Sequence, residues 1–158
     1  MAMPDIHDFA TLFRGNVRAQ LNWARLLELG SPVTQIVTAD RSMLGGLRTV
    51  WYFNSLGDPV DWFTEGAHRK SVYQVIELQA QWPQERLQRI AYFRQRIREA
   101  VDPHVVLLPT YRLRDGLLLL DATHRVVAGL LESADIRALI MTVEGPLSSD
   151  LLPDLHLS

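Results

Sequence analysis

The spacing of apolar residues sets the first thirty residues apart from the segments that follow. In residues 7–29 apolar side chains recur every three or four positions, which predicts helix. Gly15-Asn16 interrupts this spacing, so we expect either two short helices or one bent helix. Asp8 is of a type that caps a helix start, and Gly30-Ser31-Pro32 is typical of a helix end.

Strand-forming residues dominate the next two apolar runs, at residues 33–39 and 50–53. Gly45-Gly46 lies between the two runs and suits either a hairpin or a loop. Residues 54–59 have the composition of a turn. Residues 60–70 show no clear period, so we expect irregular structure there.

Residues 71–79 alternate between apolar and polar side chains, which predicts a strand. Trp82-Pro83 ends that strand, and proline is favourable at the first position of a helix. This helix is expected over residues 84–100, with inward side chains Leu87, Ile90, Ala91 and Ile97. Five arginines, some paired with Glu85 and Glu99, are expected mostly on its other faces, at positions 86, 89, 94, 96 and 98.

Three further apolar runs have the length of strands. Pro109 interrupts the first, so both a single strand and a bulged pair of strands are possible there. Asp115-Gly116 predicts a hairpin before the second run. A helix is expected from about His124 to Ser133, and Gly145-Pro146 ends the third run. The predicted strands occupy residues 105–113, 117–120 and 136–143.

The composition narrows the class of protein. The chain has 158 residues, 47% of them hydrophobic, which suits one domain with a substantial core. Eighteen acidic residues outnumber sixteen basic ones, so nucleic acid is not the expected partner and the arginines of residues 84–100 are interpreted as a solvated face. The absence of cysteine excludes disulfides, a thiolate nucleophile and cysteine metal sites.

The sequence also bears on localisation. Residues 1–8 lack the basic-then-apolar pattern of a signal peptide, and no uncharged run reaches the roughly 20 residues that cross a bilayer. We therefore expect a soluble, cytoplasmic protein that does not bind membranes. His7, His104 and His156 are too dispersed for a metal site. Three tryptophans are expected in the core or an interface, and not as stacking platforms for bases: Trp51, Trp62 and Trp82.

The strongest candidate for a functional site is the turn after the apolar run 117–120. Strand, tight polar turn and helix follow one another here, an arrangement that points backbone N–H groups at an anion. His124 and Arg125 add charge and a planar donor fork suited to phosphate. The structural alternative is a helix start in which Arg125 pairs with Asp121 or Glu132.

Asp121 and Thr123 each have two interpretations. Asp121 either holds Mg²⁺ between phosphate oxygens, or orients or deprotonates a hydroxyl group, or it caps the helix. Thr123 donates a hydrogen bond to phosphate or is itself the cap. The basic cluster of residues 68–71 lines the same cleft or, as the default, belongs to a surface loop.

From residue 71 onward the predicted order is strand, helix, strand, Asp-Gly turn, strand, Asp-x-x-His-Arg turn, helix and strand. This order resembles the ParB/sulfiredoxin-like fold, and the turn is similar to the D-G-x-H-R-x-x-A motif of some of its branches. The resemblance covers residues 71–144 and implies an α+β fold with a small mixed sheet and flanking helices. The implied core is 71–145, with a helical and β extension packed on it at 1–70 and a tail at 146–158. The motif is matched by Asp121, Thr123, His124, Arg125 and Ala128.

The sequence departs from the family pattern in ways that exclude two functions of that fold for this chain. The chain has no cysteine for sulfiredoxin chemistry, and its turn differs from the Gly-Glu-Arg-Arg type that binds CTP in the chromosome-partitioning branch. No helix-turn-helix module follows the last predicted strand, so a DNA-segregation factor is not expected. Ala122 stands where the motif has glycine, which would strain a turn that needs positive φ.

The remaining branch includes free-serine kinases that use ADP or ATP. The resemblance therefore implies a phosphotransferase that uses Mg²⁺ with ATP, ADP or CTP and acts on a hydroxylated metabolite such as a free amino acid. Glu77 or Glu85 would assist the acceptor hydroxyl, and the phosphates would be bound by Thr123, His124 and Arg125. The alternatives are a non-catalytic nucleotide- or metabolite-binding regulatory module and, less favoured, a nuclease or DNA-binding protein. The oligomeric state, a homodimer included, is left open.

Overall fold

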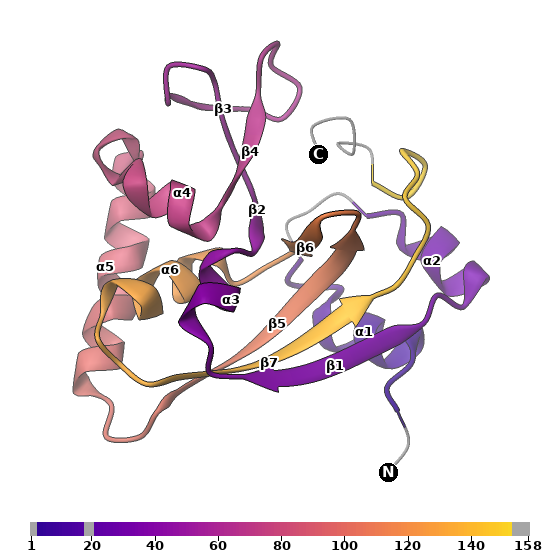
Figure 1. Cartoon of the computed structure of the whole chain (residues 1–158). Helices are drawn as coiled ribbons and strands as arrows, with labels where there is room; N and C mark the ends of the chain where they lie inside the picture. Colours follow the sequence, from indigo (N-terminus) through magenta and orange to yellow (C-terminus); the bar gives the residue numbers. More distant parts are fainter. Residues whose placement is uncertain (1–2, 18–20, 153–158) are drawn as a thin grey trace.

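A mixed sheet of seven strands, flanked by helices, forms the protein and confirms the predicted α+β class (Figure 1). The computed structural model describes residues 3–17 and 21–152. The helices are α1 (Ile6–Phe13), α2 (Trp23–Leu29), α3 (Arg41–Gly45), α4 (Val72–Glu77), α5 (Gln84–Glu99) and α6 (Thr123–Leu131), with a 3₁₀ turn η1 (Gln79–Gln81). The strands are β1 (Val33–Thr38), β2 (Arg48–Phe53), β3 (Pro59–Val60), β4 (His68–Ser71), β5 (His104–Leu113), β6 (Gly116–Leu119) and β7 (Ile136–Val143).

The strand order is β1-β7-β5-β6-β2-β3, and β4 also pairs with β2. β5 runs parallel to β7 and antiparallel to β6, and β2 runs parallel to β6. β1 and β2 do not pair with each other; β1 pairs with β7 at the opposite side of the sheet. Four of the seven strands come from residues 33–71, so the sheet itself spans the boundary expected at residue 70.

The N-terminal region contains two short helices, which is one of the two alternatives expected from the interrupted apolar spacing. Asp5, and not the predicted Asp8, is the N-cap of α1. Asp8 is the third helical residue: its N–H donates to Asp5 Oδ1 at 2.9 Å, and its Oδ2 accepts from the Asp5 N–H at 3.0 Å. Gly30, in the left-handed region at φ 61°, ends α2 as predicted.

The strand predicted over residues 71–79 is wrong, because this segment forms α4 and η1. Ser71 caps the helix, and the Gln74 side chain accepts a hydrogen bond from the Ser71 N–H, which completes a capping box. Val72 and Val75 are buried at a spacing of three, so the segment satisfies a helical period as well as an alternating one.

Two further segments differ from prediction. The region around Gly45-Gly46 is neither hairpin nor loop but helix α3, capped by Asp40. Residues 60–70, expected to be irregular, end in β4, which pairs with β2. Pro109 lies within one continuous strand, where its carbonyl accepts a hydrogen bond from the Leu120 N–H at 2.9 Å.

Apolar residues are buried on both faces of the sheet, in two clusters. Helices α3 to α6 cover one face, and α1 and α2 cover the other (Figure 1). The run 117–120 serves both faces: Leu117 and Leu119 belong to the first cluster, and Leu118 and Leu120 to the second. This alternation explains four consecutive leucines, because a strand buried on both sides has no polar face.

The described part of the tail is irregular, as predicted, but it is packed. Leu151 and Leu152 are buried in the second cluster, and the Leu151 carbonyl accepts a hydrogen bond from the Asn22 N–H at 3.1 Å. Residues 153–158, which include His156, lie outside the described residues. No helix in the described parts of the chain is long and apolar enough to cross a membrane.

Candidate functional site

The Asp121–Arg125 turn joins β6 to α6 through a strained residue. Ala122 has φ 71° and ψ 17°, and it is the only non-glycine residue with positive φ in the part of the chain that the structure describes. The left-handed conformation costs an L-residue with a Cβ roughly 1–2 kcal/mol. The strain predicted for an alanine at this position is therefore present, and such strain commonly accompanies functional sites.

Helix α6 begins without a side-chain cap. Ala122 occupies the N-cap position and makes no capping hydrogen bond, so neither Asp121 nor Thr123 has the N-cap role considered for it. The Ala122 carbonyl accepts the first helical bond, from the Val126 N–H at 3.1 Å. Ala122 thus provides no side-chain acceptor of the kind that usually satisfies the first N–H groups of a helix, and the start of α6 keeps the positive end of the helix dipole.

Arg125 and Asp121 form the ion pair that was considered as the structural alternative. Arg125 Nη2 lies 3.8 Å from Asp121 Oδ2, and both side chains are partly exposed. Such a long, partly solvated pair contributes little to stability. Glu132, the other candidate partner, instead binds Arg94 and Arg98, each at 2.7 Å.

A cleft of about 1190 Å³ opens beside this turn. Its walls come from residues 15–17 after α1, from β2, from the first half of α5 and from residues 120–125. Of the predicted site residues, the cleft brings together Asp121, Thr123, His124, Arg125 and Glu85. Glu77 is exposed near the end of α4 and does not line it.

Two arginines of α5 make the cleft more basic than the sequence indicated. Arg86 and Arg89 line it together with Arg125, against the carboxylates of Glu85 and Asp121. The cleft therefore carries an excess of positive charge although the whole chain has a formal net charge of −2. Such local focusing favours an anionic ligand.

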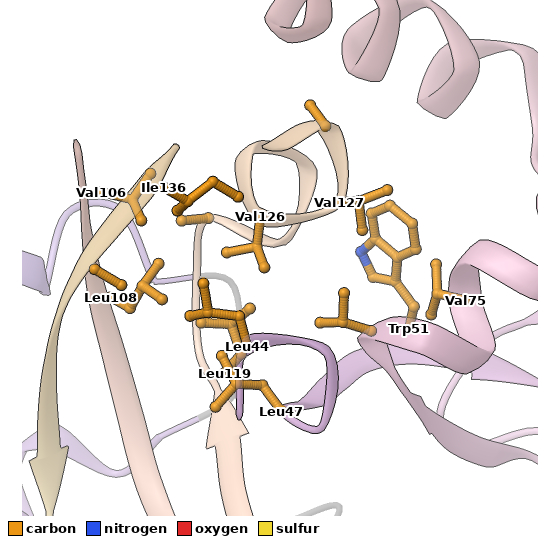
Figure 2. Close-up of a cluster of buried hydrophobic side chains, with 14 of the residues drawn as sticks. Leu44, Leu47, Trp51, Val75, Val106, Leu108, Leu119, Val126, Val127 and Ile136 are labelled. Carbon is orange, nitrogen blue, oxygen red and sulfur yellow. The ribbon is translucent and has the colours of Figure 1, made fainter. Parts of the chain in front are cut away.

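Trp51 connects Arg86 to the turn. The Arg86 guanidinium carbon lies 4.2 Å from the centroid of the Trp51 ring, and the His124 ring lies 4.9 Å from that ring in an edge-on orientation. Trp51 is buried, as predicted, and Figure 2 shows it in the apolar cluster with Val75 of α4 and Val127 of α6. The same tryptophan thus belongs to the core and forms part of the cleft wall.

The Arg86 side chain is partly buried, and one of its N–H groups loses its water without gaining a hydrogen bond. Its Nη1 is buried and has no hydrogen-bond partner. Burial lowers the pKa of the Arg86 guanidinium. Trp51 offers its face to the cation, but that interaction does not satisfy the N–H groups in the guanidinium plane.

The prediction of a solvated arginine face on α5 missed Arg86. The buried stripe of the helix is Ile90 and Ile97 with half-buried Phe93, and Arg86 extends it by one turn. Arg86 lies four residues before Ile90, so the spacing of the buried residues in the sequence already indicates an inward position at residue 86. Leu87, predicted to face inward, is 39% exposed, and Ala91 is exposed as well.

The basic cluster of residues 68–71 is a strand and not a surface loop. Arg69 is 5% exposed, and burial is the main reason that its pKa falls to about 10. The neighbouring Arg48 pairs with Asp115 at 2.7 Å. No residue of the cluster lines the cleft.

Comparison of the chain with protein-family models, with curated proteins and with solved structures gives no match. Geometry and chemistry of the cleft are therefore the basis for assigning a function.

Proposed function

We propose that this protein is a nucleotide-dependent phosphotransferase with a ParB/sulfiredoxin-like fold, which transfers a phosphoryl group from ATP or ADP to a hydroxylated metabolite such as a free amino acid. One observation carries the proposal. An uncapped helix start, flanked by His124 and Arg125, faces a cleft with an excess of arginine.

Phosphate binding is the chemistry that this arrangement suits best. The first-turn N–H groups of α6 and the helix dipole both favour a negative group at the helix start. Arg125 adds a guanidinium, whose planar donors match phosphate oxygens, and Thr123 and His124 add donor groups beside it. Transfer of a phosphoryl group depends mainly on positioning and charge stabilisation, so few residues suffice.

The cleft is large enough for an acceptor molecule beside the nucleotide, and it has an acidic residue that can accept the proton of the acceptor hydroxyl. A volume of about 1190 Å³ exceeds the roughly 300–1000 Å³ of a typical ligand pocket, and so admits a nucleotide with a second small molecule. In the proposed reaction the acceptor oxygen bonds to the terminal phosphorus as the bond from that phosphorus to the leaving nucleotide oxygen breaks. Glu85 accepts the hydroxyl proton; it is preferred to Glu77 because only Glu85 lines the cleft.

Asp121 is the residue that would hold Mg²⁺. Magnesium is commonly bound by one or two carboxylates together with phosphates and waters, so a single aspartate beside a phosphate site fits this ion. When bound, the ion would neutralise charge on the phosphate oxygens. The Asp121–Arg125 pair at 3.8 Å keeps the carboxylate next to the cation that serves the same phosphates.

The test combines binding and turnover. Thermal unfolding is measured with ATP, ADP and CTP, each with Mg²⁺, and phosphoryl transfer is assayed with serine, threonine and homoserine. We expect a nucleotide to raise the unfolding temperature and one hydroxy-amino acid to be phosphorylated, with loss of transfer in Glu85→Gln. Absence of both stabilisation and turnover with every pair contradicts the proposal.

A second candidate function is a non-catalytic module in which nucleotide or metabolite binding controls a partner. It is favoured by two features of the turn and cleft: Ala122 strains the turn at φ 71°, and Glu85, the acid proposed to accept the proton, is exposed in the first turn of α5. Its signature is nucleotide binding that is lost in Arg125→Ala, without hydrolysis or transfer.

A further inference from the structure

The cleft contains a second cation whose surroundings differ from those of Arg125. Arg125 is partly exposed and has Asp121 as its neighbour, whereas Arg86 is partly desolvated and has a buried Nη1 without an acceptor. Burial alone accounts for the lowered pKa of Arg86, and no described carboxylate offsets it. A cation kept in this state is stabilised by an anion that arrives with the ligand.

The arginines of α5 provide an internal comparison. Arg96 also stacks on an aromatic ring, with its guanidinium carbon 5.7 Å from the Tyr92 centroid, but its Nη1 donates to the Tyr92 hydroxyl at 2.8 Å. Arg96 is exposed and lies outside the cleft. Arg86, on the same helix, faces the cleft without such a hydrogen bond at Nη1.

We propose that Arg86, supported by the face of Trp51, forms a second anion subsite of the cleft. It binds a carboxylate or phosphate oxyanion other than the group held at the start of α6. The proposal deepens the proposed function, because it makes the ligand, or the pair of ligands, carry two separate oxyanions. Trp51 contacts both Arg86 and His124, so one ring fixes the spacing between the two subsites.

Two sources supply an oxyanion of this kind: the phosphate chain of the nucleotide and the carboxylate of the acceptor. Dissociation constants are measured by calorimetry for ATP with Mg²⁺, pyrophosphate and malonate. The proteins are the wild type, Arg86→Gln, Arg86→Lys and the matched control Arg96→Gln. We expect Arg86→Gln to weaken at least one probe by about tenfold to a hundredfold, the range for a lost charge-assisted contact.

The pattern of losses identifies the source. Weaker ATP and pyrophosphate binding assigns Arg86 to the nucleotide phosphates, and weaker malonate binding alone assigns it to a carboxylate. Arg86→Lys is expected to lose less than Arg86→Gln because it keeps the charge, and Arg96→Gln is expected to stay within about twofold of the wild type. Equal affinities in Arg86→Gln and Arg96→Gln overturn the subsite, as does a wild-type cleft that binds none of the probes.

A measurement on the wild type does not depend on how the variants fold. Phenylglyoxal modification of arginines is followed by mass spectrometry with and without pyrophosphate or malonate. Protection of Arg86 but not of Arg96 is expected, and unchanged reactivity of Arg86 contradicts the subsite. If ATP is not bound but Arg86 still governs malonate binding, the proposed function fails and the subsite stands; if ATP is turned over equally by Arg86→Gln, only the subsite fails.

Discussion

At its C-terminal end helix α6 is held by charged side chains, whereas at its N-terminal end it meets the cleft without a capping side chain. Arg41 donates hydrogen bonds to the carbonyls of Leu130, Glu132 and Ala134 at 2.6–3.1 Å. The Glu132 carboxylate binds two arginines of α5. The C-terminal end of the helix is therefore hydrogen-bonded within the protein, whereas the N-terminal end is the proposed phosphate site.

The junction from β4 into α4 shows that this chain also closes helix starts. Ser71 Oγ accepts from the Gln74 N–H at 3.3 Å, and Gln74 Oε1 accepts from the Ser71 N–H at 2.9 Å. The same kind of junction, from β6 into α6, has Ala122 in place of a capping residue. The two helix starts therefore differ in their capping: Ser71 caps α4, and Ala122 provides no side-chain cap for α6.

The largest change in stability is expected when the C-terminal end of α6 loses the hydrogen bonds from Arg41. Arg41→Ala leaves three carbonyl groups without their charged donor, so we expect the free energy of unfolding to fall by about 2–3 kcal/mol. Chemical denaturation measures this change. Arg25→Ala, which removes only exposed ion pairs, is the control and should change stability by less than about 1 kcal/mol. Equal losses in the two variants would show that the end of α6 is not anchored by Arg41.

Removal of a positive charge at the N-terminal end of α6 should weaken nucleotide binding and leave the stability of the fold unchanged. Arg125→Gln is expected to weaken ATP binding roughly tenfold to a hundredfold, because it deletes a guanidinium beside the helix start. The unfolding free energy should change little, since the Asp121–Arg125 pair is long and partly exposed. Calorimetric titration and denaturation separate the two quantities; a stability loss without an affinity loss would give Arg125 a structural role.

The closed start of α4 gives the opposite pattern. Ser71→Ala removes the cap and should lower the unfolding free energy by about 1 kcal/mol. Nucleotide affinity is expected to match that of the wild type, because Ser71 does not line the cleft. Ser71→Asp, which restores a capping oxygen, should recover most of the stability.

Relief of strain at the open end should stabilise the protein. Ala122→Gly removes the Cβ from a left-handed residue, and we expect a gain of roughly 0.5–1 kcal/mol in unfolding free energy. The reciprocal control is Gly30→Ala, at φ 61° with no atom near the added Cβ, which should lose a similar amount. A loss of stability in Ala122→Gly would mean that the alanine methyl contributes more in the core than the strain costs.

The smallest expected effect is a pH dependence of stability that comes from Glu132, at the C-terminal end of α6. Hydrogen bonds from Arg98 and then Arg94 hold the pKa of Glu132 below its usual value of 4.5. This carboxylate therefore stabilises the fold above pH 4.5, and the contribution is lost as the pH falls through the lowered folded-state pKa. The stability difference between wild type and Glu132→Gln should shrink between pH 6 and pH 3. A constant difference would show that the ion pairs do not contribute.

Local signals in the sequence predicted the elements nearest to the turn. Asp115-Gly116 predicted the β5–β6 hairpin, and the apolar run at 136–143 matches β7 residue for residue. The turn residues His124 and Arg125 also lie together in the cleft as expected. These features depend on neighbours in the chain, so their physics is contained in short stretches of sequence.

Features that depend on distant partners were not predicted. Nothing near β1 indicates that it pairs with β7 about a hundred residues later. Arg86 was assigned to solvent because of its charge, although its position continues the buried stripe of α5. For α4 the sequence contains two conflicting local signals. Ser71 and Gln74 have the spacing of a capping box, which indicates a helix, whereas the alternating pattern of residues 71–79 predicts a strand.

The leucine run before the turn has a consequence for when the site exists. β6 lies inside the sheet and contributes alternate side chains to both apolar clusters, so it separates from the rest only when both clusters come apart. Its amide protons should exchange with solvent at the rate of global unfolding. The turn is attached directly to this strand, so a partly folded chain lacks the proposed anion site, and ligand binding there would report the completed fold.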